Sequence, residues 1–156
     1  GGAALRMGER RNWMYMKSFL ADLRARFELK AVQFPGQVTL DGFSKIRTFR
    51  EFDERYTAPL HGFTGAEDYW TRCSSRAFLD GIRRPTLLVN AKDDPFLVES
   101  CFPVDAAARS EWLYLEAPER GGHVGFVTIG NDGHYWSEDR ALGFAAAHGG
   151  SAGNFP

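Results

Sequence analysis

The stretch that decides the fold is residues 85–96, which read P-T-L-L-V-N-A-K-D-D-P-F. Residues 86–89 form a short apolar run of β-favouring side chains without alternation, which predicts a strand covered on both faces in a parallel sheet. Catalytic and ligand-binding groups of such sheets gather beyond the carboxyl ends of the strands. Asp93 and Asp94 follow this strand directly, although two acidic residues before a proline are also typical of an ordinary turn.

A second strand-and-loop unit lies downstream and carries a histidine. Residues 111–116 alternate polar and apolar side chains, which predicts a less buried edge strand. The loop 121–126 reads G-G-H-V-G-F, and three glycines around His123 indicate a backbone shaped to present the imidazole. A carboxylate after one strand and a histidine after the next form the acid and base part of a Ser-His-Asp relay. Asp94 and His123 are 123 − 94 = 29 residues apart, which leaves room for one helix and one strand.

Helical patterns surround these two units. Residues 8–30 carry apolar side chains at steps of three and four, which predicts a helix with one apolar stripe and a basic remainder. Thr48 and Glu51 have the spacing of a capping box at the start of a helix. The elements expected are helices over 8–30, 48–56, 65–75, 104–109 and 134–147, strands near 86–90 and 112–116, and a Pro- and Gly-marked loop over 57–63.

Length and composition bound the class of protein. The 156 residues, 44% of them hydrophobic, suit one domain with a core, and a net charge of −1 gives no electrostatic case for nucleic-acid binding. Two cysteines make no disulfide framework, so we expect a reduced, cytoplasmic chain without a transmembrane segment. The first residue is glycine, and two strands cannot form an independently stable parallel sheet. We therefore expect the C-terminal portion of a longer protein.

Other candidate catalytic or metal-binding residues have weaker contexts. Ser44 follows an apolar run and a glycine, but Ile46 occupies the position where a nucleophile elbow needs its second glycine. His61, beside proline and glycine, fits a hydrogen-bonded structural role. A metal site built from His61, His123 and His134 lacks ligand spacing, so no metal is expected.

The motifs together resemble a known family. The stretches 48–63, 66–79, 85–96 and 121–126 are similar to the C-terminal half of the YheT-like (ABHD1/ABHD3-type) α/β-hydrolases. The resemblance implies an α/β fold with a helical cap segment over 8–80, then the last two sheet strands with flanking helices over 81–147, and a flexible tail over 148–156. It implies Asp94 as the triad acid and His123 as the base. The substrate would be a small-molecule carboxylic ester, acyl or lipid-like, and no metal or other cofactor would be needed.

The chain also departs from that family. In α/β-hydrolases the nucleophile precedes the acid and the histidine, and no G-x-S-x-G elbow is expected anywhere in this chain. The acid and base then have no nucleophile to activate, so the isolated chain is expected to be inactive. Its expected partner is the N-terminal half of the hydrolase fold. The alternative is a non-catalytic fragment or an interaction module that pairs with a separate N-terminal half.

Overall fold

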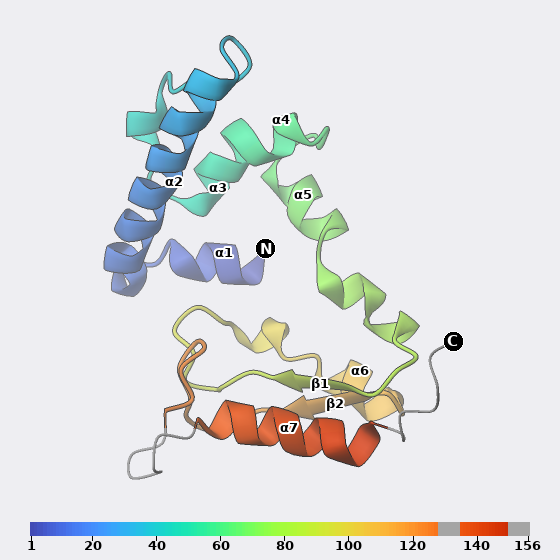
Figure 1. Cartoon of the computed structure of the whole chain (residues 1–156). Helices are drawn as coiled ribbons and strands as arrows, with labels where there is room; N and C mark the ends of the chain where they lie inside the picture. Colours follow the sequence, from blue (N-terminus) through green and yellow to red (C-terminus); the bar gives the residue numbers. More distant parts are fainter. Residues whose placement is uncertain (128–134, 150–156) are drawn as a thin grey trace. The chain divides into compact units, whose positions relative to one another are not determined.

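The computed structural model of the chain describes residues 1–127 and 135–149. The chain divides into two compact units, Gly1–Ser74 and Ser75–Pro156. Figure 1 shows both units. In the described part of the chain, no helix is both long enough and apolar enough to cross a bilayer.

The first unit is helical. Its core consists of Phe43, Ile46, Phe52 and Tyr56. Phe27 packs against this cluster, and its ring centroid lies 4.8 Å from that of Tyr56. Buried aromatic side chains therefore form much of this cluster, and such rings bury large apolar areas. Its elements are α1 (Gly2–Met7), η1 (Arg10–Asn12), α2 (Trp13–Gln33), η2 (Phe43–Lys45), α3 (Phe49–Phe52), the π-helical turn η3 (Asp53–Thr57), α4 (Ala58–Leu60) and α5 (Ala66–Arg72).

Helix α2 differs from the prediction of a single apolar stripe. It begins at Trp13 and not at residue 8, because a separate α1 and a 3₁₀ turn precede it. One side carries Met16, Leu20, Leu23 and Phe27 into the core. A second set of small or apolar side chains, spaced by three and four residues, lies on the opposite side and is exposed in this unit. The set is Met14, Ser18, Ala21, Ala25, Leu29 and Val32.

The helix expected over 48–56 is present and runs further than predicted. The capping box is confirmed, since Thr48 Oγ1 accepts the Glu51 N–H while the Glu51 carboxylate accepts the Thr48 N–H. The predicted loop over 57–63 is wrong for its first residues, because the π turn leads directly into α4. Pro59 is tolerated there because it lies in the first turn of α4, where its missing N–H needs no partner.

The second unit holds the sheet. Strands β1 (Thr86–Val89) and β2 (Leu113–Glu116) are parallel, with Thr86 opposite Leu113 and Val89 opposite Glu116. The predicted parallel pairing is therefore confirmed. Complete cover of both faces is not seen: every residue of β1 is half-buried, since in the described residues the sheet has two strands. The unit also contains η4 (Ser75–Gly81), η5 (Glu99–Cys101), α6 (Val104–Arg109) and α7 (Trp136–His148).

Helix α7 lies along one face of this small sheet (Figure 1). Arg140 donates to both carboxylate oxygens of Glu116 at the end of β2, and Phe144 stacks edge-on against Tyr114 at 5.2 Å. The hydrogen bonds to Glu116 raise the pKa of the Arg140 guanidinium above its usual value. Residue 134 of the predicted helix and most of the predicted tail, 150–156, lie outside the described residues.

Candidate active site

The loops that follow β1 and β2 run together at the carboxyl edge of the sheet. The pairing continues past the strands, since Asn90 N donates to Glu116 O at 3.0 Å and Lys92 N donates to Pro118 O at 2.8 Å. The two carboxyl ends meet because the strands are parallel and in register. This edge brings together the two predicted site residues, Asp94 and His123.

Asp94 is buried, and both of its carboxylate oxygens have partners. Oδ1 accepts the Phe96 N–H at 2.8 Å, which forms a local turn two residues on. Oδ2 lies 2.8 Å from His123 Nδ1. An ionised carboxylate can only accept, so this contact assigns the proton of the neutral imidazole to Nδ1 and leaves Nε2 with a free lone pair.

The ring of His123 is held on one side and open on the other. Its side chain is 51% exposed, whereas that of Asp94 is 2% exposed. The Phe96 ring meets the imidazole edge-on, with centroids 4.8 Å apart. Among residues 1–127 and 135–149, Asp94 is the hydrogen-bond partner of the ring, and Nε2 has none. A buried carboxylate therefore contacts an imidazole whose side chain is about half exposed.

The backbone around His123 explains two of the three glycines. Gly122 has a φ of +63°, which disfavours any residue with a Cβ. A Cβ on Gly121 would lie 2.5 Å from ring carbons of Phe126 and 2.9 Å from Ala91 Cβ, so the position has no room for one. Gly125 has neither constraint, because a Cβ there would meet its nearest atom at 3.6 Å.

Asp93, the first residue of the acidic pair, has no role predicted from its sequence context. The structure shows that its Oδ1 accepts the backbone N–H groups of Gly121 and Gly122 at 2.9 and 2.8 Å. Nothing in the local sequence distinguishes this residue from an exposed turn aspartate. Its partners become apparent only when the two loops are placed side by side.

The remaining candidates lie apart from this pair. Ser44 is in η2, follows no strand, and its carbonyl accepts from Arg47. His61 is the exposed residue that ends α4 in the first unit. His134 lies outside the described residues, and within those that are described no three His, Cys, Asp or Glu side chains are grouped to hold a metal ion.

The expectation that the chain holds no G-x-S-x-G is wrong, because one such string lies near its C-terminal end. Residues 149–153 read G-G-S-A-G, with Ser151 at the position of the nucleophile. The string follows helix α7, whereas an elbow follows a strand, and it comes after both the acid and the base. Residues 150–153 lie outside the described residues. The pattern match alone does not make Ser151 a nucleophile.

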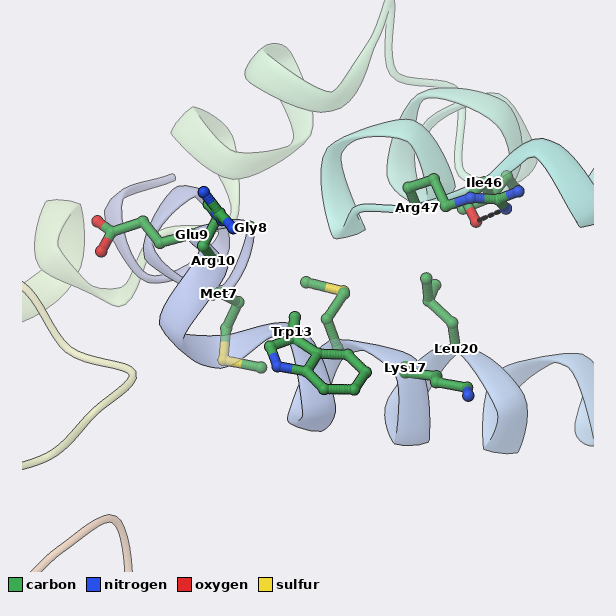
Figure 2. A pocket seen from close by; sticks show the side chains of 10 residues that line it. Met7, Gly8, Glu9, Arg10, Trp13, Lys17, Leu20, Ile46 and Arg47 are labelled. Carbon is green, nitrogen blue, oxygen red and sulfur yellow. Dashed lines mark hydrogen bonds between the residues drawn. The ribbon is translucent and has the colours of Figure 1, made fainter.

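A separate hollow lies within the first unit (Figure 2). Its volume is about 520 Å³, and Met7, Trp13 and Met16 are among the apolar residues that line it. Neither residue of the Asp94–His123 pair contributes to it. The complete lining is Met7, Gly8, Glu9, Arg10, Trp13, Met16, Lys17, Leu20, Ile46 and Arg47.

The fold and the site define a class: an α/β protein with a buried Asp paired to an accessible His at the carboxyl edge of a parallel sheet. The chain is 36% identical over 116 residues to YheT of Escherichia coli, whose name marks it as a candidate esterase. It is 31% identical over 117 residues to phospholipase ABHD3 of Mus musculus, and 35% identical over 94 residues to monoacylglycerol lipase of Saccharomyces cerevisiae. These alignments cover 73%, 74% and 60% of the chain.

The chain belongs to the YheT/ABHD-like family of α/β-hydrolases. It spans about a third of the length of YheT, 34%, and 28% and 21% of the other two relatives. No model of a protein family and no solved structure matches the chain.

Proposed function

We propose that Asp94 and His123 are the acid and base of a catalytic triad that hydrolyses carboxylic esters. The observation that carries this proposal is the 2.8 Å contact between His123 Nδ1 and the buried Asp94 Oδ2, with the other side of the ring exposed. This is the arrangement in which an acid fixes the tautomer and orientation of a general base. The chemistry of the relay requires no metal ion.

In this proposal His123 transfers protons and Asp94 orients and stabilises His123. Nε2 of His123 takes the proton of an attacking hydroxyl and later returns it to the leaving alcohol. Asp94 stays ionised, holds the proton on Nδ1 and stabilises the imidazolium that forms between the two steps. Its two hydrogen bonds, to Phe96 N and His123 Nδ1, fix the carboxylate so that it need not reorganise during the reaction.

The substrate class follows from the relatives. One relative is named a phospholipase and another a monoacylglycerol lipase, and the second name describes the hydrolysis of an acyl ester. We extend this class to the present chain as acyl or lipid-like esters. Both relatives, each at 31% identity or more, support the extension.

The nucleophile and the oxyanion hole are proposed to come from a polypeptide outside this sequence. No G-x-S-x-G precedes Asp94, where the chain order of the fold requires it. Residues 8–80 would then form a helical cap segment, and 81–147 the last two strands and flanking helices of an incomplete sheet. The half-buried β1 and the exposed second stripe of α2 support this view, because both offer apolar surface for further packing.

The test is covalent labelling with a fluorophosphonate probe, which reacts with activated serines. It compares the isolated chain with the full-length product of its locus. We expect labelling of the longer product alone, and loss of that labelling in His123→Ala. Equal labelling of wild type and His123→Ala would overturn the assignment of the base.

Labelling of the isolated 156-residue chain would overturn the proposal of an external nucleophile. The variants Ser44→Ala, Ser74→Ala, Ser75→Ala and Ser151→Ala would then identify the serine concerned. Absence of labelling from both proteins would favour the second candidate, a non-catalytic module that pairs with a separate half. The exposed stripe on α2, Met14 to Val32, is the observation that favours this candidate.

A further inference from the structure

We infer that Asp93 is a positioning residue that fixes the loop carrying His123, so that the adjacent aspartates hold the backbone and the imidazole separately. The inference rests on the proposed function for its catalytic meaning. Asp93 Oδ1 accepts the N–H groups of Gly121 and Gly122 at 2.9 and 2.8 Å. Asp94 Oδ2 binds the ring of the next residue, His123.

The two amides form a concave site that suits an anion. Successive backbone N–H groups that converge on one point bind negatively charged oxygens, and here the point is occupied by a carboxylate of the same chain. The N–H groups of Gly121 and Gly122 reach the same carboxylate oxygen, and Gly122 itself has a left-handed φ of +63°. Hydrogen bonds to an ionised acceptor are stronger than those between neutral groups.

The hydrogen bonds from Gly121 and Gly122 to Asp93 hold a part of the loop that the other contacts of the loop do not fix. The His123 side chain is 51% exposed, so packing alone does not fix the direction of its ring. Upstream, Lys92 N donates a hydrogen bond to Pro118 O and so holds the start of the loop. Phe126 N donates to Gly121 O and closes the turn. Asp93 supplies the contact between them, directly before the histidine. The imidazole is thereby fixed at its backbone by Asp93 and at Nδ1 by Asp94.

The test compares Asp93→Ala with Asp93→Asn in the intact chain. Asparagine keeps a side-chain carbonyl that accepts the same two amides, whereas alanine has no acceptor. Two readouts are used: hydrogen exchange of the Gly121 and Gly122 amides, and the tautomer of His123 from ring ¹⁵N shifts. The His123 signal is assigned by its loss in His123→Ala.

We expect Asp93→Ala to speed exchange of both amides by about tenfold or more, the equilibrium change for a hydrogen bond to a charged acceptor. The same variant should convert His123 from the Nδ1-protonated tautomer to a mixture. Asp93→Asn should keep most of the wild-type signature. A wild-type tautomer in Asp93→Ala, with the protein folded, would overturn the inference.

Ser110→Ala is the matched control for general destabilisation. Ser110 Oγ also accepts two backbone amides, those of Trp112 and Leu113, each at 3.1 Å, but it lies before β2. This variant should leave the His123 tautomer unchanged. If it alters the tautomer as strongly as Asp93→Ala, the effect of Asp93 is general stability and the inference fails.

A variant that fails to fold does not leave the inference undecided. Without any variant, the wild-type protein must show slow exchange of the Gly121 and Gly122 amides. Rapid exchange of both amides would overturn the inference that Asp93 holds them. Failure of the proposed hydrolase function has a different signature. In that case the amide and tautomer signals follow these expectations while fluorophosphonate labelling is absent.

Discussion

Asp94 Oδ2 and His123 Nδ1 lie 2.8 Å apart, although one side chain is 2% exposed and the other 51%. Each residue belongs to a different loop, and the loops meet because β1 and β2 are parallel neighbours in register. The two side chains therefore differ in their access to solvent. The carboxylate is shielded from water, whereas about half of the histidine side chain is exposed.

The first prediction concerns ester turnover by the full-length product of the locus. We expect Asp94→Asn to lower kcat by about 10⁴-fold, because an amide that donates to Nδ1 selects the wrong tautomer. His123→Ala should cause a loss of at least about 10³-fold. The measurement is steady-state hydrolysis of a chromogenic acyl ester by purified variants.

The control for this prediction is His61→Ala. His61 is exposed at the end of α4, and its backbone N–H makes the helix-ending hydrogen bonds, which alanine preserves. Its turnover should remain within about twofold of wild type, the spread usual for neutral surface changes. A large loss in His61→Ala, with His123→Ala unaffected, would place the base elsewhere.

The second prediction concerns the stability of the His123 loop. In Gly121→Ala the new Cβ would lie 2.5 Å from Phe126 ring carbons and 2.9 Å from Ala91 Cβ, and Ala91 is 1% exposed. We expect the free energy of unfolding to fall by about 1–3 kcal/mol, the cost of overpacking. Urea denaturation followed by tryptophan fluorescence measures it.

Gly143→Ala provides the opposite case within the same unit. Gly143 lies inside α7, and a Cβ there would meet nothing within 4 Å. Alanine should therefore raise the free energy of unfolding by about 0.5–1 kcal/mol through helix propensity. Destabilisation by both substitutions would show that the glycine effect at 121 is not one of close packing.

Local sequence signals indicated an aspartate after one strand and a histidine after the next, and the choice of Asp94 over Asp93 came from the family resemblance. Asp94 follows a short apolar strand, and His123 is enclosed by glycines. The role of Asp93 could not be predicted in the same way. It depends on which amides face its carboxylate once two loops, separated by β2 and α6, come together.

The fold was predictable to a similar extent and for similar reasons. Parallel pairing follows from strand composition, and the capping box from the spacing of Thr48 and Glu51. The helical course through Pro59 depends on the π turn before it, which no residue type signals. The second stripe of α2 shows the same three-and-four spacing as the first, so periodicity alone does not decide which side is buried.

The third prediction tests the capping box that begins α3. Thr48→Ala removes the Oγ1 acceptor of the Glu51 N–H and should lower the free energy of unfolding by about 1 kcal/mol. The control is Thr71→Ala, since Thr71 is exposed within α5 and alanine favours a helix interior. Thermal unfolding followed by circular dichroism should show a lower Tm for the first variant and no loss for the second.

The last prediction concerns pH and the start of α5. The Thr64 backbone N–H donates to Asp68 Oδ2 at 3.0 Å, and this hydrogen bond, with a smaller effect of Arg72, holds the pKa of the Asp68 carboxyl below its usual value of 3.8. The unfolded chain therefore binds the proton first as the pH falls. The stabilisation is fully present above pH 3.8 and is lost as the pH drops through the lower pKa of the folded state.

Asp68→Asn removes this titration but keeps a carbonyl acceptor for the Thr64 N–H. The stability advantage of wild type over Asp68→Asn should be greatest at neutral pH and should shrink below pH 3.8. Direct NMR titration of the carboxyl in wild type and Arg72→Gln separates the two causes. Because the Thr64 hydrogen bond is the larger of the two causes, Arg72→Gln should reverse only part of the lowering of the Asp68 pKa. A carboxyl that titrates at 3.8 or above in wild type would contradict the prediction.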